Sequence, residues 1–241
     1  MEFSLLGAAF VGVGALYLVL RWEGARGNAA DCTKDLWDIA IGAGVAGLVV
    51  GRLASMVIAG TNPLANLGDI LIVRSGVDTG WAVLGALAAL VLLSRDETLQ
   101  VGAGVAAATL AGLGGWEAGC LVRDTCHGTA TDAPWGIALS GSEVVRHPVG
   151  IYAALGFAVA TLVVILVKRK TQHPLLVIGC ALALAGAVRL VTEPFRSALG
   201  SRPTLWYWAA LAVGGAIAAF LSLRSRRHRL SRLRKDGGSS S

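Results

Sequence analysis

Three ionisable side chains near the end of the sixth apolar segment could hold a phosphate or a carboxylate inside a membrane. Arg189 lies in that segment, Glu193 follows four residues later, and Arg196 follows three residues after Glu193. Residues four apart share one helix face, so Glu193 is placed to direct the Arg189 guanidinium. Pro194 interrupts the helix and frees backbone groups that can line a cavity. A purely structural ion pair would explain the same residues, and the sequence leaves both readings open.

Arg52 is a second charge in an apolar environment, in the middle of the second apolar segment. An arginine at the bilayer centre costs about 2.5–3.5 kcal/mol on insertion scales, so it is expected to face the protein interior. It could contact a substrate there. A structural role, with the guanidinium satisfied by carbonyl groups or by an acid such as Asp69 or Asp78, is the reading that we favour.

Glu117 lies near the end of the fourth apolar segment, in a stretch rich in glycine. Glycine permits close approach by a ligand or by another backbone. A carboxylate in a half-apolar site can accept a proton from a reacting group. Glu117 could equally be the ionic partner of Arg189 or Arg123, and we favour that interpretation.

The polar stretch 119–147 between the fourth and fifth apolar segments carries two histidines, His127 and His147. His147 directly precedes Pro148, a residue favoured in the first turn of a helix. It could pack at the start of that helix or transfer a proton. Arg146, its neighbour, adds a cation at the same place.

Four cysteines are present, and none forms a Cys-x-x-Cys pair of the kind that binds zinc. We therefore expect no metal and no cofactor. Cys120 and Cys126 lie in or next to the polar stretch, and they could form a disulfide if that face meets an oxidising compartment.

The composition is that of a membrane protein. Hydrophobic residues make up 55% of the 241 residues and charged residues 15%, whereas about 25% charged residues are typical of soluble domains. The net charge of +6 does not indicate nucleic-acid binding, because the basic residues gather at the ends of apolar segments and in the tail. The tail is expected to orient the protein and to contact anionic lipid.

Crossing a bilayer takes about 20 apolar residues. On this basis the sequence predicts an all-α polytopic fold with seven transmembrane helices. The predicted spans are Phe3–Leu20, Asp38–Gly60, Val77–Ser94, Leu99–Ala118, Pro148–Val167, Pro174–Val191 and Thr204–Leu223.

Basic residues decide the expected orientation. If the C-terminus is cytoplasmic, 14 of the 21 lysines and arginines lie on that side and five on the other. This asymmetry follows the positive-inside rule and places the N-terminus outside. We therefore expect one membrane domain over residues 1–223, with the 119–147 loop on the outer face. A basic cytoplasmic tail with a flexible end is expected over residues 224–241.

Several motifs together resemble bacterial prolipoprotein diacylglyceryl transferases. They are Pro134-Trp135-Gly136 followed by Arg146-His147-Pro148 and Tyr152, the Arg189-x-x-x-Glu193-x-x-Arg196 pattern, Gly51-Arg52-Leu53, and the stretch Ile72–Gly85. The resemblance covers most of the chain. It implies a multi-pass enzyme of the bacterial inner membrane that moves the diacylglyceryl group of phosphatidylglycerol to a lipoprotein cysteine. By the same resemblance Arg189 would contact the lipid headgroup.

The chain departs from the family pattern at several polar positions. The family's histidine falls near Gly80, and its signature arginine, asparagine and glutamate fall on Gly112, Gly115 and Cys120. Phe3 stands where the first span of the family has a tyrosine. Asp78, Glu117 and His127 lie close in sequence to the vacated positions and could replace them.

The expected function is transfer of a phospholipid-derived group from an anionic phospholipid to an acceptor, with a prolipoprotein or another membrane protein as a second partner. The candidate catalytic residues are His147, Glu117, Asp78 and His127. The candidate substrate-binding residues are Arg189, Glu193, Arg196, Arg146, Tyr152 and Arg52. A non-catalytic family member that binds lipid or a partner membrane protein is the alternative. A transporter is disfavoured because no inverted repeat is visible.

Overall fold

The structure, a computed structural model, describes residues 2–26, 32–63, 76–123, 127–138, 143–171, 173–196 and 204–236. Its long helices are α1 (Glu2–Gly24), α2 (Leu36–Ile58), α4 (Thr79–Ser94), α5 (Thr98–Ala118), α7 (Val149–Lys170), α8 (Pro174–Thr192) and α9 (Thr204–Asp236). Short elements are the helix α6 (Cys120–Arg123) and the 3-10 turns η1 (Arg95–Glu97) and η2 (Glu193–Phe195).

Five of these helices are long and apolar enough to cross a membrane, namely α1, α2, α7, α8 and α9. Each coincides with a predicted span, so that part of the prediction is confirmed. The other two predicted spans also form helices, α4 and α5, but neither is among these five. α4 has 16 residues, or about 24 Å at 1.5 Å per residue. α5 contains several glycines and Glu117, and most of its residues are buried among other helices rather than exposed to lipid.

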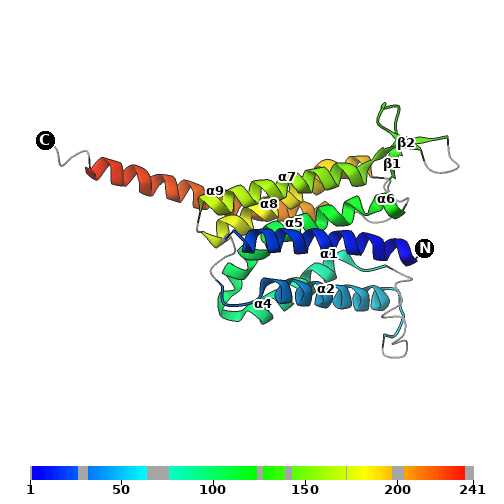
Figure 1. Cartoon of the computed structure of the whole chain (residues 1–241), viewed down its shortest axis with the longest axis horizontal. Coiled ribbons are helices and arrows are strands. Elements are labelled where there is room, and N and C mark those ends of the chain that lie inside the picture. The colour runs from blue at the N-terminus through cyan, green and yellow to red at the C-terminus, as the bar shows by residue number, and fades with distance from the viewer. Residues whose placement is uncertain are drawn as a thin grey trace.

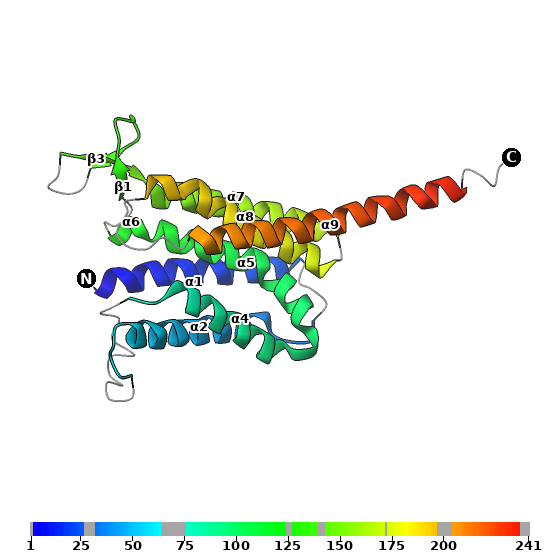
Figure 2. The ribbon, with the colours of Figure 1, turned by 180° about the vertical axis from the view of Figure 1, so that it is seen from behind.

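The helices run side by side in an elongated bundle (Figure 1). α5 packs against α1 and α7, α2 packs against α4, and α9 packs against α8. The α2–α4 pair forms one side of the bundle and α7, α8 and α9 form the other, as the reverse view confirms (Figure 2). α1 begins at the end that carries the strands, whereas α9 projects beyond the opposite end.

Glycine allows the closest of these contacts. A Cβ atom at Gly115 of α5 would lie 2.6 Å from the carbonyl oxygen of Val11 on α1. At Gly214 of α9 it would lie 2.5 Å from the backbone nitrogen of Ala183 on α8. Helices in lipid associate through such close backbone approach, because burial from water contributes little to helix pairing there.

The apolar core lies where α5, α7 and α8 meet. Phe157 and Val164 of α7 are fully buried there, together with Ala107 of α5. Small residues on α5 and larger ones on α7 interdigitate there, which fixes the positions of both helices.

The polar stretch 119–147 was expected to be a long loop, but it contains a short helix and short strands. It begins with α6 and holds the strands β1 (His127–Ala130) and β2 (Ile137–Ala138), and β3 (Val145–Pro148) starts within it. The strands form an antiparallel sheet in the order β1-β3-β2. A bridge between Gly128 and Arg196 joins this sheet to the turn that follows α8.

α9 is longer than predicted. The span was expected to end at Leu223, but the helix continues without a break to Asp236. The basic segment that was expected to be a tail is therefore helical up to that residue, and residues 237–241 lie outside the described part of the chain.

A buried ion pair ties three helices together at the end opposite the strands. The Lys168 ammonium of α7 donates a hydrogen bond to Glu23 Oε2 of α1 at 3.0 Å and another to the Gly104 carbonyl of α5 at 3.0 Å. The side chains of Lys168 and Glu23 are only 7% and 2% exposed. Removing one partner of such a pair leaves an uncompensated charge in the interior.

We predict that Glu23→Gln and Lys168→Met each lower the free energy of unfolding by about 3 kcal/mol. The double variant should recover much of that loss, because neither charge then remains unpaired. The free energies can be measured by denaturant titration in mixed micelles. Additive losses in the double variant would show that the two residues are not coupled.

A second contact at this end joins the start of the α2 segment to the α4–α5 turn. The Thr33 hydroxyl and backbone N–H donate to the two carboxylate oxygens of Glu97 at 2.7 and 2.9 Å. The side-chain hydrogen bond from Thr33 is the main cause that holds the pKa of Glu97 below its usual value. The contact therefore stabilises the fold when Glu97 is ionised.

This lowered pKa predicts an acid-dependent loss of stability. The contribution is fully present above the pKa of Glu97 in the unfolded chain, and it disappears as pH falls through the lower pKa of the folded protein. Thermal unfolding measured between pH 7 and pH 3 should therefore show a shallower acid decline in Glu97→Gln than in the unaltered protein. Identical pH profiles would contradict the assignment.

Candidate functional site

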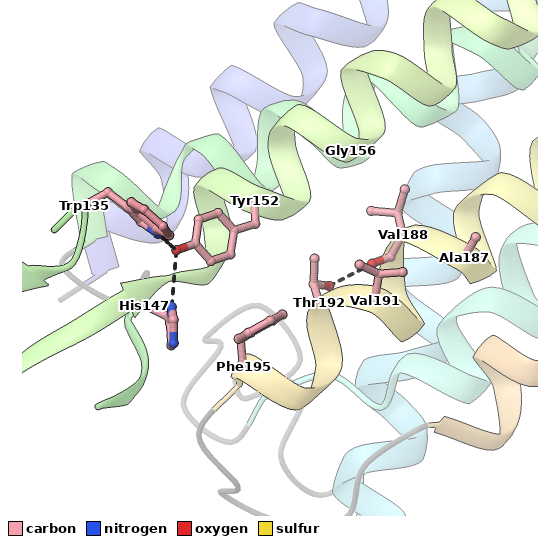
Figure 3. Close-up of a pocket in the computed structure, with 9 residues that line it drawn as sticks. All are labelled: Trp135, His147, Tyr152, Gly156, Ala187, Val188, Val191, Thr192 and Phe195. Carbon is pink, nitrogen blue, oxygen red and sulfur yellow. Dashed lines mark hydrogen bonds between the residues drawn. The ribbon is translucent and has the colours of Figure 1, made fainter. Parts of the chain in front are cut away.

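A cavity of about 560 Å³ lies between α7 and α8 at the strand-bearing end. Its walls are mainly apolar and include Gly156 of α7 and Val188 and Val191 of α8. Trp135, His147, Tyr152 and Phe195 gather at one end of this cavity (Figure 3). A largely apolar cavity with a few convergent polar groups is typical of a site that binds a small molecule or a lipid.

Two nitrogen atoms converge on one hydroxyl group in this site. Trp135 Nε1 donates to the Tyr152 hydroxyl at 2.7 Å, and His147 Nδ1 lies 3.2 Å from the same oxygen. Figure 3 shows both contacts, with the second ring nitrogen of His147 turned away from Tyr152. The hydrogen bond at Nδ1 fixes the imidazole orientation and leaves the second nitrogen available for other chemistry.

Local sequence explains how these side chains meet. β3 ends at Pro148 and α7 begins at the next residue, so His147 lies two residues before the helix and Tyr152 lies on its first turn. On the other side, Pro194 turns the end of α8 into η2, which brings Phe195 against both rings. Ring-centre distances from Phe195 are 5.0 Å to His147 and 6.0 Å to Tyr152, with edge-to-face geometry.

A buried carboxylate links two arginines of the segment at the end of α8, although none of these three charged residues lines the pocket. Glu117 of α5 accepts a hydrogen bond from Arg189 Nη1 of α8 through one oxygen. Its other oxygen accepts from Arg196 Nη2 at 3.0 Å. The Glu117 side chain is 10% exposed, and the Arg189 guanidinium also lies 5.2 Å from the centre of the Phe157 ring. Glu117 is therefore an ionic partner of Arg189, which is the interpretation that we favoured from the sequence.

Arg196 retains hydrogen-bonding capacity. Its Nε atom is buried, and no group in the described part of the chain accepts a hydrogen bond from it. The side chain is 35% exposed, about twice as much as that of Arg189 at 17%. Arg196 is therefore the better placed of the two to give a donor to an incoming anion.

Glu193 and Arg146 support this region through backbone contacts. Glu193 is buried at the start of η2, and its carbonyl accepts from the Arg196 backbone N–H at 3.0 Å. Arg146 Nη1 donates to the Gly128 carbonyl at 3.2 Å. Gly128 must be glycine, because a Cβ atom there would lie 2.0 Å from the Phe195 carbonyl oxygen.

His127 lies on β1 and has a buried Nδ1 without a hydrogen-bond partner among the described residues. It pairs in register with Pro148, the residue after His147. The sheet therefore brings His127 to the same end of the molecule as the pocket, although His127 does not line it.

Two other candidates lie on the α2–α4 pair. Arg52 is 3% exposed and donates to the Gly76 carbonyl at 3.0 Å, as the structural interpretation expects. Asp78 accepts from the Trp81 backbone N–H at 3.0 Å and thereby caps the start of α4. Neither side chain lines the α7–α8 pocket.

The structure also shows what occupies the positions where the chain departs from the transferase motifs. Gly80 lies close to the Trp206 indole of α9, and Gly112 and Gly115 pack against the backbone of α1. Cys120 is disulfide-bonded, whereas Cys180 has a free thiol. Cys126, the expected partner of Cys120, lies outside the described residues. No cluster of potential metal ligands occurs among the described residues.

Trp135 and Phe195 were not among the candidates from the sequence. Trp135 stands within a motif that the resemblance had already identified, and Phe195 stands between Pro194 and Arg196. A signal for Trp135 was therefore present in the sequence. For Phe195 the only signal was its neighbours, since nothing in a linear sequence brings α8 against β3.

Fold and site together define a multi-pass helical membrane protein with an apolar pocket and a pair of bridged arginines at one end. A sequence model of the prolipoprotein diacylglyceryl transferase family matches residues 3–228. The match covers nearly the whole chain, so the protein belongs to this family. Membership implies a membrane diacylglyceryl transferase that acts on prolipoproteins. Among curated proteins, none matches this sequence at a significant level.

The bridge that Glu117 forms between the two arginines predicts an effect on the free energy of unfolding. Glu117→Gln should lower the free energy of unfolding by about 3 kcal/mol, because two partly buried guanidinium groups lose the carboxylate that they share. Glu143→Gln, an exposed acid in the polar stretch, is the matched control. Equal effects of the two substitutions on unfolding in mixed micelles would contradict a structural role for the bridge.

Proposed function

We propose that the protein transfers a diacylglyceryl group from an anionic phospholipid, phosphatidylglycerol, to the cysteine of a prolipoprotein. In this proposal all seven long helices cross the bacterial inner membrane, the strands and the pocket lie on the outer face, and the C-terminus is cytoplasmic. The observation that carries the proposal is the pocket itself. Apolar walls of α7 and α8 lead to His147 and Tyr152. The segment that forms the α8 wall also carries the two arginines that pair with Glu117, at neighbouring positions in the sequence.

The reaction requires a cation at the phosphate. The cysteine sulfur attacks the terminal carbon of the diacylglyceryl group, the bond from that carbon to the phosphate oxygen breaks, and glycerol phosphate leaves with the electron pair. Negative charge therefore develops on the departing phosphate. Arg196, the more exposed of the two arginines, would bind a phosphate oxygen. Arg189 would contribute charge while Glu117 and the Phe157 ring fix its direction.

The reaction also requires a base for the thiol proton. His147 meets this requirement when its own hydrogen is on Nδ1 and donates to the Tyr152 oxygen, because the other nitrogen is then an acceptor. Trp135 donates to the same oxygen and holds it in place. Glu117 is less suited to this role, since both its oxygens already accept hydrogen bonds from arginines.

A non-catalytic family member that binds lipid or a partner membrane protein is the second candidate. The positions where the motifs depart from the family favour it, because Gly80, Gly112 and Gly115 provide helix packing and Cys120 forms a disulfide. In that case the pocket would hold a lipid without converting it.

A transfer assay separates the candidates. Purified protein in detergent is supplied with phosphatidylglycerol and a lipobox peptide, and all lipid and peptide products are followed by mass spectrometry. A diacylglyceryl-modified peptide is the expected result. Lipid consumption with an unmodified peptide would indicate another acceptor, and no change in either would favour the non-catalytic member.

Within this assay, Tyr152→Phe should lower kcat by about 100-fold, because removal of the hydroxyl frees the His147 ring from its oriented position. Tyr207→Phe on α9 makes the same chemical change away from the pocket and should leave the rate unchanged. Arg189→Lys should reduce turnover while the folded protein persists. Equal rates in Tyr152→Phe and Tyr207→Phe would remove His147 and Tyr152 from the mechanism.

A further inference from the structure

A second apolar groove lies on another side of the bundle, between α1, α5 and α7. It has a volume of about 590 Å³. Its floor consists of small residues such as Ala111, Gly114 and Ala158. Leu155 and Leu162, which also line it, are 63% and 60% exposed, so the groove faces the surroundings of the bundle rather than its core.

The groove has the length of a lipid chain. Its α7 wall extends from Ile151 to Ile165, a distance of about 21 Å at 1.5 Å per residue. Half of a hydrocarbon core is about 15 Å thick, so a chain from one leaflet fits within the groove. Apart from the Trp22 indole, the polar side chain among its described lining residues is Thr161, whose hydroxyl donates to the Phe157 carbonyl.

Two guanidinium groups gather at the end of this groove that lies farthest from the strands. Trp22 of α1 lines the groove there. The Arg26 guanidinium lies 4.2 Å from the Trp22 ring centre, and the Arg169 guanidinium of α7 lies 5.6 Å from it. Both arginines are exposed. Neither has a carboxylate partner among the ion pairs of the described residues.

The buried ion pair described above fixes this arrangement. Glu23 follows Trp22 on α1, and Lys168 precedes Arg169 on α7. Because Glu23 and Lys168 are paired inside the bundle, the adjacent Trp22 and Arg169 are held at a set distance from each other. The two cations are therefore organised by the fold before any ligand arrives.

We propose that this groove is a binding site for one anionic phospholipid of the leaflet opposite the transfer site. Its acyl chain lies along α5 and α7, and its phosphate lies between Arg26 and Arg169. The indole of Trp22 lies at the junction of chain and headgroup, where aromatic side chains are favoured. Juxtamembrane arginines attract anionic headgroups in the same way at membrane surfaces.

This site is separate from the proposed donor site. The α7–α8 pocket lies at the strand-bearing end, whereas Trp22, Arg26 and Arg169 lie at the opposite end of the bundle. The two cavities share no lining residue. Lipid binding here does not depend on transfer activity, so either proposal can fail without the other.

Photo-crosslinking tests the site by its location. The full chain in nanodiscs receives phosphatidylglycerol with a diazirine on its acyl chain, and crosslinked peptides are mapped by mass spectrometry. We expect adducts on α1 near Val19 and on α7 near Ala158. The same chains on phosphatidylcholine should give far fewer adducts, because the headgroup has no net negative charge.

Variants make the test specific. Arg26→Ala with Arg169→Ala should reduce the groove adducts about tenfold or more. The matched double variant Arg21→Ala with Lys170→Ala removes the same charge at the same end and should leave them unchanged. Arg21 contacts Tyr17 instead, through a 3.0 Å hydrogen bond.

A variant that fills the groove tests the site independently of the two arginines. Ala158→Phe places a ring in the groove from an exposed position and should also reduce the adducts. Equal labelling of the two double variants, or equal labelling by the two lipids, would overturn the proposal. Adducts elsewhere on the protein with none in the groove would overturn it as well.

Discussion

The carboxylate of Glu117 is the group on which the site depends. Two guanidinium groups, from the end of α8 and from the residue after η2, pair with this one carboxylate. Without an anion between them, their repulsion and their loss of water would oppose packing of α8 on α5. One carboxylate oxygen serves each arginine, so the same contact assembles the helices and orients the cations. The contact that stabilises the packing of α8 on α5 therefore also holds the two cations of the proposed lipid site in place.

This arrangement bears on how the chain differs from its family. The signature acid of the family would fall on Cys120, one helical turn after Glu117, and Cys120 is instead disulfide-bonded. The family's signature arginine falls on Gly112, where a side chain would press on α1. Here the acid lies one turn earlier, and it pairs with Arg189 of α8 and with Arg196, the residue after η2. Both arginines belong to a pattern that the chain shares with the family, so the acid is the part of the pair that differs.

Much of the architecture was predictable, and the reason is the hydrocarbon solvent. A bilayer requires long apolar helices, so each of the seven predicted spans contains a helix that begins within a few residues of the expected position. The pairing of Glu117 with Arg189 was also predictable, because an isolated charge in such a segment must find a partner. These two residues are 72 positions apart and lie on different helices. Spacing along one helix cannot reveal a contact between two helices.

The small sheet could not be predicted from the sequence, because its strands have only two to four residues and carry little hydrophobic alternation.

The uninterrupted length of α9 has a mechanical consequence. Its 33 residues form a rod of about 50 Å, of which the part up to Arg224 is apolar enough to span a membrane. The remainder projects past the end of the bundle (Figure 1). Over its membrane portion α9 packs closely on α8, the helix that carries Arg189. A load applied to the projecting basic end is therefore transmitted along one continuous helix to α8, which forms one wall of the pocket.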